Sequence, residues 1–310
     1  MSTKVFIDGN SGTTGLKIES LLLQVGGFEL IRIDPALRHE VRVRLEKIGE
    51  ADITVLCLPD KEASEIAALA PKTVRIIDAS TAHRTREDWT YGLPELSPVQ
   101  REQIRSAARV AVPGCHATGF ILLAKPLIDA GFACPDYPFS VHSVTGYSGG
   151  GKNMIAQYAE QDALLKAPRA YALKQMHKHL PEMTKQAGLD AEPIFTPHVA
   201  DFYSGLSVMV PIHRRLLQKG VGLTEIRNLF EKRYADERFI TIRAETYDPE
   251  DGFLSADAMQ GRNDLEILIT GNEDRIMLTA RYDNLGKGAS GAVLQCMNIM
   301  LGLPEERGLL

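Results

Sequence analysis

The sequence lacks the features that mark several large classes of protein. It has no apolar run long enough to cross a membrane, no signal-peptide layout at its N-terminus MSTKVFIDG, and no dense cluster of lysine and arginine. We therefore expect a cytoplasmic protein that binds neither a membrane nor a nucleic acid. No internal repeat or low-complexity linker interrupts the 310 residues, and that length favours one large or two medium domains.

Cysteine is also scarce. The four cysteines lie far apart and form no CxxC pair, which argues against a structural zinc site or a disulfide framework. We predict no metal site, and we expect reduced thiols, which can act as nucleophiles. The net charge of −5 does not exclude an anionic small substrate, because a local site can be positive on an acidic protein.

What is present in the first third is an alternation of strand and helix patterns. Apolar strand-like runs stand at 4–8, 28–33, 52–58, 74–80 and 109–113, and helical patterns at 13–25, 39–49, 62–70 and 101–107. Strands that alternate with helices pair in parallel through right-handed crossovers. We therefore predict a doubly wound, Rossmann-like nucleotide-binding domain over about the first 115 residues.

The pattern changes after Gly146. Helical stretches at about 153–165 and 171–187 are followed by strand-like runs at 206–216, 239–247, 265–271 and 275–284, and by a helix at 286–303. This order is typical of an α+β domain with a mainly antiparallel sheet. The predicted fold class is thus α/β, with a Rossmann-like domain joined to an α+β domain.

The motif DGNSGTTG lies between the first strand and the first helix. Glycines in such a turn let the backbone approach a pyrophosphate, which the N–H groups of the helix N-terminus also attract. The spacing is G-x-x-G-x-x-G and departs from G-x-G-x-x-G, so a tight turn packed on the sheet is the alternative. The residues assigned to the cofactor here are Gly9, Ser11, Gly12, Thr13, Thr14 and Gly15.

The choice of cofactor is open at the end of the second strand. Asp34 there favours NAD, because a carboxylate at this place binds the ribose 2′-hydroxyl. Arg32 and Arg38 flank it and favour NADP, because they can pair with a 2′-phosphate. A solvated helix start is the alternative for both arginines.

Cys115, in the stretch VPGCHATGF, sits where an apolar strand meets a helix expected at 117–130. The positive end of the helix dipole lowers the pKa of a thiol placed there, and Gly114 allows a sharp turn that exposes the sulfur. We predict a catalytic thiol, with a buried structural cysteine as the alternative. The other three cysteines have no such setting and are expected to be inert.

A nucleophilic cysteine needs a partner that handles protons. The run QMHKHLPEM offers His177, His179 and Glu182. Residues two apart on a helix face different ways, so we expect one imidazole to point into the site and Glu182 to orient it. Two solvated histidines at a helix end are the alternative. His116, beside Cys115, is expected to point elsewhere.

Assembled, these motifs resemble the N-acetyl-gamma-glutamyl-phosphate reductase family of arginine biosynthesis, in its shorter form. The resemblance rests, in family order, on DGNSGTTGL, DASTAHR, YGLPEL, VPGCHATG, HKHLPEM and DNLGKGASGAVLQCMNIMLGL. Together they span essentially the whole chain. The stretch at 79–84 and the compact middle of the chain depart from the longer form of the family.

The resemblance implies a thioester mechanism. Cys115 attacks the acyl phosphate, phosphate leaves, a hydride from NADPH (or NADH) reduces the thioester, and N-acetylglutamate 5-semialdehyde is released. His177, more than His179, handles the proton, with Glu182 behind it. The resemblance further implies domains at 1–116 with 285–310 and at 117–284, and a homodimer or homotetramer.

Additional site residues follow from the same resemblance. Asn284 and Gly288 are expected near the nicotinamide. The substrate is a small anionic acyl phosphate, and the residues assigned to it are Arg84, Ser148, Gly149, Lys152 and Arg281. The glycine-rich loop 145–152 is expected to cradle the leaving phosphate through its backbone N–H groups. A flexible turn is the alternative for the loop, and plain surface charge is the alternative for Arg84, Lys152 and Arg281.

Three other functions remain as alternatives. Aspartate-semialdehyde dehydrogenase shares the architecture and the C-terminal motif, and it would reduce a shorter acyl phosphate by the same chemistry. A dinucleotide-binding sensor would use Cys115 only structurally. A thiol hydrolase would need no cofactor. The YGLPE and HxHxPE runs favour the glutamyl-phosphate enzyme.

Overall fold

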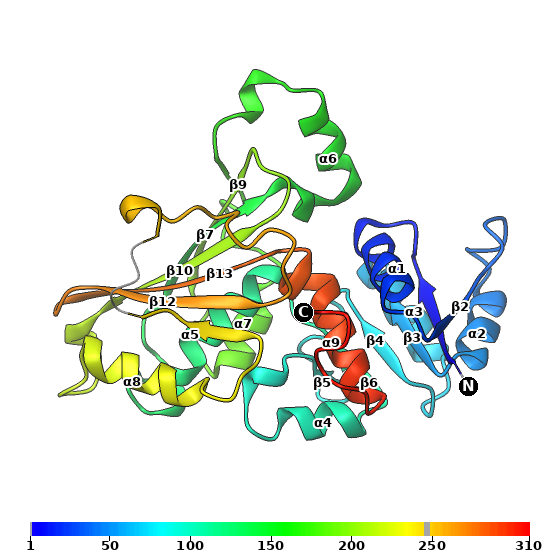
Figure 1. The fold of residues 1–310 in the computed structure, drawn as a ribbon, viewed down its shortest axis with the longest axis horizontal. Helices are drawn as coiled ribbons and strands as arrows, with labels where there is room; N and C mark the ends of the chain where they lie inside the picture. The colour runs from blue at the N-terminus through cyan, green and yellow to red at the C-terminus, as the bar shows by residue number, and fades with distance from the viewer. Residues whose placement is uncertain (1, 245–248) are drawn as a thin grey trace. The chain divides into compact units, whose positions relative to one another are not determined.

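Two compact units make up the chain in this computed structural model, which describes residues 2–244 and 249–310. One unit comprises Met1–Gly114 and Ala289–Leu310, and the other Cys115–Gly288 (Figure 1). The sequence places Cys115 and Gly288 in the nucleotide-binding part. In the structure both belong to the second unit, which Cys115 opens and Gly288 closes.

The first unit is built on a six-stranded sheet in which every paired strand runs parallel, in the order β2-β1-β3-β4-β6-β5. The strands are β1 Thr3–Asp8, β2 Phe28–Ile31, β3 Ile53–Leu56, β4 Ile76–Asp78, β5 Thr90–Tyr91 and β6 Arg109–Ala111. The strand order reverses where β1 pairs with both β2 and β3. Open α/β sheets bind ligands at such a reversal, and the glycine turn follows β1 there.

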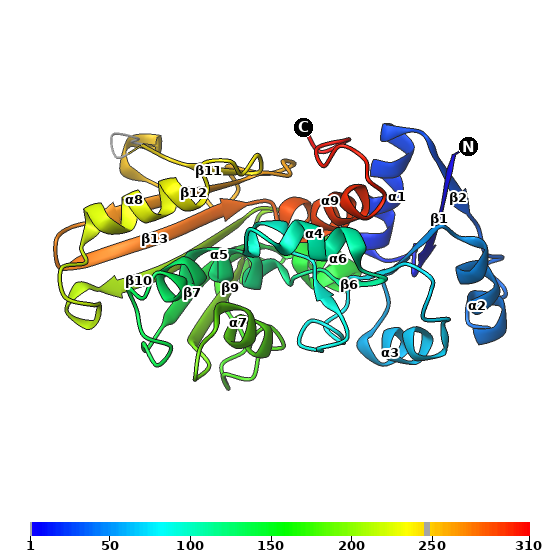
Figure 2. The same ribbon diagram turned by 90° about the horizontal axis from the view of Figure 1, so that it is seen from below.

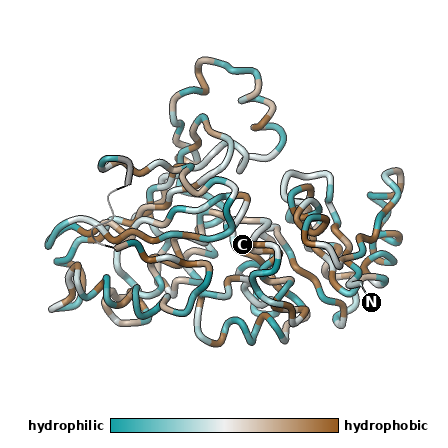
Figure 3. Tube along the Cα trace, in the orientation of Figure 1, coloured by the Kyte–Doolittle hydropathy of each residue, from teal (hydrophilic) through white to brown (hydrophobic). Residues whose placement is uncertain are grey.

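Five helices accompany this sheet in the described part of the unit. They are α1 Thr13–Val25, α2 Val41–Glu50, α3 Asp60–Leu69, α4 Gln100–Ser106 and α9 Gly291–Met300. Helix α1 contacts α9 and α2 contacts α3, and the two pairs lie on opposite sides of the strands (Figure 2). The central strands are buried on both faces, as their continuous apolar runs predict. Hydrophobic segments follow the strands in Figure 3.

The second unit is built on a seven-stranded sheet in the order β11-β12-β13-β10-β7-β9-β8. Its strands are β7 Ser140–Gly146, β8 Arg169–Ala170, β9 Ile194–Ala200, β10 Leu206–His213, β11 Ile240–Ile242, β12 Leu265–Gly271 and β13 Arg275–Tyr282. Among the described strand pairs of this second sheet, only β7–β9 and β11–β12 are parallel. The sheet is therefore mixed but mainly antiparallel, and the predicted fold class is confirmed.

Helices cover one face of this second sheet. The helices of the unit are α5 Cys115–Asp129, α6 Gly151–Ala159, α7 Leu180–Ala187 and α8 Leu223–Arg233. Figures 1 and 2 place α5, α7 and α8 on the same side of the strands. On β10, Val208 and Val210 are buried, whereas Met209 and Pro211 are only partly buried on the opposite, outer face. Side chains that alternate in this way follow the period of two of a β-strand.

Some predicted elements differ from the structure. The helix predicted at 171–187 is wrong over its first half, because α7 begins at Leu180 with Pro181 in its first turn. The helix predicted at 286–303 begins as a π-helical turn, Gly286–Ser290, before α9. The strand predicted at 239–247 is shortened to β11, and residues 245–247 lie outside the described part of the chain.

Short 3-10 turns complete the connections, at Pro94–Leu96, Tyr147–Gly150, Ala163–Leu165, Arg214–Leu216 and Pro249–Gly252. Within residues 2–244 and 249–310, none of the helices combines the length and the apolar character needed to span a bilayer.

Candidate active site

Cys115 is the first residue of α5, two positions earlier than the predicted start of the helix. The preceding segment is held by Arg84, which donates from Nε to the Val112 carbonyl (2.9 Å) and from Nη2 to the Ala79 carbonyl (3.1 Å). A thiol at this position faces the positive end of the helix dipole, which favours its thiolate form.

The Tyr282 hydroxyl supports the first turn of α5. It donates to the Cys115 carbonyl and accepts from the Gly119 N–H at 2.9 Å. These two backbone groups are the i and i+4 pair that an α-helix usually joins directly. Burial, followed by the charge of the Cys115 thiolate, raises the pKa of Tyr282 well above its ordinary value. The hydroxyl therefore keeps its proton and acts as a donor.

Three imidazole rings gather around His116, the residue that follows Cys115. The His116 ring centroid lies 5.9 Å from that of His177 and 5.7 Å from that of His179, and the latter two are 4.6 Å apart. The His116 ring thus lies among the same imidazoles that were predicted to handle protons. Burial, followed by the proximity of His177, lowers the pKa of His116 to about 3, so this imidazole is neutral near pH 7.

His116 is held by one hydrogen bond at each ring nitrogen. Nδ1 contacts the Ser143 hydroxyl on β7 at 2.9 Å, and Nε2 contacts the Tyr171 hydroxyl at 2.8 Å. Tyr171 and Ser143 were not singled out from the sequence. No spacing rule reveals them, because they lie 55 and 27 residues from His116 along the chain.

His177 and His179 lie in the turn before α7, so the argument from helical spacing does not apply to them. His179 is the N-terminal cap residue of α7, and its backbone N–H donates to Nδ1 of His177 at 3.1 Å. Glu182 lies in the first turn of α7 and is 1% exposed. The turn thus brings both imidazoles to the cluster.

The glycine-rich loop is tied to the C-terminal motif. Asn284 donates from Nδ2 to the Ser148 hydroxyl (3.0 Å) and accepts from the Gly205 N–H (2.8 Å). Gly149 and Lys152 are exposed. Gly288 packs against the nucleophile, because a Cβ added there would lie 3.0 Å from the Cys115 Cβ.

Arg281 points away from Cys115. It precedes Tyr282 on β13, and successive strand residues face opposite sides of a sheet. Its guanidinium is buried against the Glu266 carboxylate (Nε to Oε1, 2.6 Å), and Nη1 donates to the Ser255 carbonyl at 3.1 Å. Its charge is thus balanced within the protein by Glu266, which argues against the predicted role of Arg281 as a substrate ligand.

The glycines of the nucleotide turn have distinct roles. Gly9 has φ +90°, and a Cβ there would lie 2.3 Å from the Cys57 carbonyl oxygen. At Gly15 a Cβ would lie 2.6 Å from the Gly9 carbonyl oxygen. At Gly12 the nearest heavy atom would be 3.5 Å away, so this position is open. Gly9 and Gly15 close the turn, while Gly12 leaves room for a phosphate, which fits a dinucleotide.

The residues at the end of β2 leave the cofactor choice open. Asp34 is exposed, and its carboxylate accepts from the Ala36 N–H at 2.9 Å. Arg32 pairs with Glu19 at 2.6 Å. Arg38 is exposed and contacts the His39 ring at 3.1 Å.

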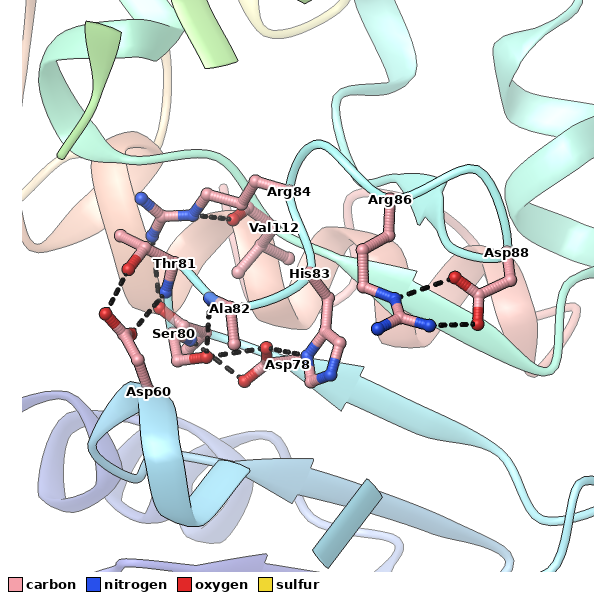
Figure 4. A network of polar contacts seen from close by, with 11 residues as sticks. Asp60, Asp78, Ser80, Thr81, Ala82, His83, Arg84, Arg86, Asp88 and Val112 are labelled. Carbon is pink, nitrogen blue, oxygen red and sulfur yellow. Dashed lines mark hydrogen bonds and ion pairs between the residues drawn. The ribbon is translucent and has the colours of Figure 1, made fainter. Parts of the chain in front are cut away.

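The DASTAHR segment forms a polar network after β4 (Figure 4). Asp78 accepts from the Ser80 hydroxyl (2.7 Å) and contacts Nδ1 of His83 (2.6 Å), and the His83 ring stacks on Trp89 at 3.9 Å. Burial, followed by the charge of Asp78, raises the pKa of nearby Cys57 to about 12. Cys57 therefore stays a thiol, as expected for an inert cysteine.

Comparison with known proteins gives the family. The chain is 41% identical to "N-acetyl-gamma-glutamyl-phosphate reductase 2" of Nostoc sp. over 99% of both chains, and to the protein so named in Pseudomonas putida over 98% of both. It is 41% identical to the Brucella ovis reductase over 97% of this chain and all of that one. The chain belongs to the N-acetyl-gamma-glutamyl-phosphate reductase family.

The matching domain models and solved structures agree with this membership. A semialdehyde dehydrogenase NAD-binding domain matches residues 34–107, and a semialdehyde dehydrogenase dimerisation domain matches 115–284. Aspartate semialdehyde dehydrogenase II of Vibrio cholerae has a TM-score of 0.73 at 16% identity, covering 97% of this chain and 99% of that one. The Francisella tularensis enzyme has a TM-score of 0.71 at 14% identity, covering 96% and 100%. This family member is an oxidoreductase with a nucleotide-binding domain.

Replacing Gly119 by alanine should damage the support of Cys115. The added Cβ would lie 2.6 Å from the Tyr282 hydroxyl and 3.0 Å from the Val208 Cβ. We expect the free energy of unfolding, measured in urea, to fall by about 2 kcal/mol. Gly49→Ala in α2 is the control, because nothing lies within 4 Å of its added Cβ, and it should gain about 0.5–1 kcal/mol. Equal stability of the two variants would contradict this account.

The nucleotide turn offers a second matched pair. Gly9→Ala should lower the free energy of unfolding by about 2 kcal/mol, because its backbone is strained and its methyl meets the Cys57 carbonyl. Gly12→Ala should change stability by less than about 0.5 kcal/mol but weaken NADP⁺ binding by about tenfold or more in a calorimetric titration. Wild-type affinity in Gly12→Ala would remove Gly12 from the cofactor site.

Proposed function

We propose that the chain catalyses the reversible reduction of N-acetyl-L-glutamyl 5-phosphate to N-acetyl-L-glutamate 5-semialdehyde, with release of phosphate, in arginine biosynthesis. The observation that carries this proposal is the position of Cys115 at the start of α5 beside the imidazole cluster. It occurs in a chain 41% identical, over almost its whole length, to proteins named for that reaction.

The reaction begins at the Cys115 sulfur. The thiolate attacks the acyl carbon, the carbon–oxygen bond to phosphate breaks, and a thioester forms. When bound, NADPH supplies the hydride that reduces this thioester. The resulting thiohemiacetal then loses its proton, the carbon–sulfur bond breaks, and the aldehyde leaves with the Cys115 thiolate restored. The helix start that stabilises the thiolate serves both the first and the last step.

His177 is the proposed acid and base for the thiohemiacetal hydroxyl. Its Nδ1 accepts from the His179 backbone N–H, which holds the ring, and Nε2 is the atom proposed to exchange the proton with the substrate. Glu182 in the adjacent first turn of α7 is the proposed carboxylate behind the histidines. His116 is unsuited to this role, since its depressed pKa keeps it neutral.

We also propose contacts with the cofactor and the substrate. Gly12 and the neighbouring hydroxyls are proposed to hold the pyrophosphate of the dinucleotide, and Arg38 to pair with the 2′-phosphate of NADP. Asn284 and Gly288 are proposed to lie near the nicotinamide. The leaving phosphate is assigned to Ser148, Gly149 and Lys152, with Arg84 as a further substrate cation.

The outer face of the second sheet is the proposed surface of a homodimer. Helices cover the opposite face, and the residue pattern leaves partly buried or exposed apolar side chains here: Val144, Ile194, Met209, Pro211 and Met277. The dimerisation-domain model matches the part of the chain that contains this sheet. A second copy seated on this face would bury these side chains.

The function is tested in the oxidative direction, with N-acetylglutamate 5-semialdehyde, phosphate and either NADP⁺ or NAD⁺, by nicotinamide absorbance. Cys115→Ser should reduce kcat by at least about 10⁴-fold, and His177→Asn by about 10²-fold or more. Cys134→Ser is the control, because Cys134 is exposed elsewhere in the second unit. Turnover of aspartate 4-semialdehyde without the N-acetylglutamyl compound would overturn the assignment.

The dimer is tested with a charge on the outer face. Met209→Glu should shift the mass measured by light scattering from twice the chain mass to that of one chain, because an unpaired carboxylate would be buried at the interface. Leu69→Glu is the control, since Leu69 on α3 is also exposed but lies on the first unit. A dimer that persists in Met209→Glu would place the interface elsewhere.

A further inference from the structure

Building on the proposed function, we propose that Tyr171 is a further catalytic residue, whose hydroxyl donates a hydrogen bond to negative charge on the Cys115 sulfur. His116 and Ser143 act as positioning residues that hold this hydroxyl and direct its proton. The inference concerns the hydrogen-bonded chain Ser143–His116–Tyr171. Its central residue, His116, directly follows the nucleophile Cys115 in the sequence.

The chain of contacts is continuous and enclosed. The Ser143 side chain is fully buried on β7, and its hydroxyl contacts Nδ1 of His116 at 2.9 Å. Nε2 of His116, which is itself 2% exposed, contacts the Tyr171 hydroxyl at 2.8 Å. One imidazole thus fixes the position of the phenol from the first turn of α5, where Cys115 also lies.

The Ser143 hydroxyl determines which atom is the donor in each hydrogen bond of this chain. Among the residues that the structure describes, His116 Nδ1 is the hydrogen-bond partner of its hydroxyl, so the buried O–H donates to that nitrogen. A neutral imidazole that accepts at Nδ1 carries its proton at Nε2. Nε2–H therefore donates to the Tyr171 oxygen, and the phenolic proton is left to donate to another group.

The electrostatics agree with Cys115 as that group. Burial, followed by the charge of the Cys115 thiolate, raises the pKa of the Tyr171 hydroxyl far above its usual range, so it stays protonated and able to donate. The other ionisable side chains around it are His177, whose ring centroid is 5.8 Å from that of Tyr171, and His179 and Tyr282, which surround Cys115 and His116. A hydrogen bond to a thiolate stabilises it before attack and again as it leaves the thiohemiacetal.

The test measures the thiolate directly, without substrate or cofactor. Iodoacetamide alkylation of Cys115 is followed against pH in the Cys134→Ser background, which removes the exposed thiol. Tyr171→Phe should raise the midpoint of the alkylation profile by about one pH unit, which is about a tenfold slower reaction below the midpoint. An unchanged profile would overturn the proposal.

Two substitutions that place an amide side chain at residue 116 test the positioning role of His116 separately from the role of Tyr171. The side-chain amide of His116→Gln reaches the place of Nε2 and can still donate to Tyr171, so its midpoint should stay within about 0.3 units of wild type. His116→Asn reaches only the place of Nδ1 and should match Tyr171→Phe, with no further shift in the double variant. Equal profiles for the two amides would reject His116 as the positioning residue.

Two controls keep the outcomes distinct. Tyr171→Phe retains the ring but leaves the buried His116 Nε2–H unpaired, so its free energy of unfolding in urea should fall by about 1–3 kcal/mol. Circular dichroism at each pH of the titration should show the variant folded, so a shifted alkylation profile reports on the thiol. If His116→Asn does not fold, Ser143→Ala replaces it and should shift the profile in the same direction, because the tautomer is no longer fixed. Alkylation needs no turnover, so a failed reductase assay and a failed Tyr171 prediction are separate results.

Discussion

The Tyr282 hydroxyl, placed between the Cys115 carbonyl and the Gly119 N–H, is the contact on which the active site depends. Tyr282 lies on β13, inside the second sheet, and its hydroxyl supports the first turn of α5, which carries the nucleophile. The contact requires that residue 119 have no Cβ, since a methyl group there would overlap the hydroxyl at 2.6 Å. It also requires a phenol that keeps its proton, which burial and the nearby thiolate both favour. Sheet, helix and thiol are thus fixed to one another by a single side chain.

Around this support the site separates two kinds of imidazole. His116 is enclosed and neutral, and each of its ring nitrogens has a hydrogen-bond partner, which suits a residue that orients others. His177 and His179 lie in the turn before α7, where the His177 ring accepts a hydrogen bond from the His179 backbone N–H. Burial removes the first from acid–base chemistry, because the charged form would lose its hydration. The proposed mechanism therefore assigns proton transfer to His177 of the turn.

Much of this arrangement follows from the sequence, and the remainder depends on side-chain direction. The alternation of strands and helices and the Pro113–Gly114 bend are enough to place Cys115 near a helix start, because local periodicity and turn chemistry determine them. The partners of His116 could not be predicted, because adjacency along a chain does not say which way a side chain points. The helix before His179 was overextended, although Pro181 is a residue that favours a first turn. Tyr171 and Ser143 reach the site only through tertiary contacts, which periodicity does not encode.

Strand register decides which residues of β7 take part in chemistry. Ser143 is aligned with Val208 and faces α5, whereas His142 is aligned with Met209 on the outer face. A slip of one residue would exchange them, because strand side chains alternate between faces. A histidine would then meet His116 in place of a hydroxyl, and the tautomer that directs the Tyr171 proton would no longer be fixed. The same alternation sends Tyr282 toward Cys115 and Arg281 away from it. The pairing of β7, β10 and β13 therefore fixes the proposed catalytic face and the proposed dimer face at once, so neither can shift without the other.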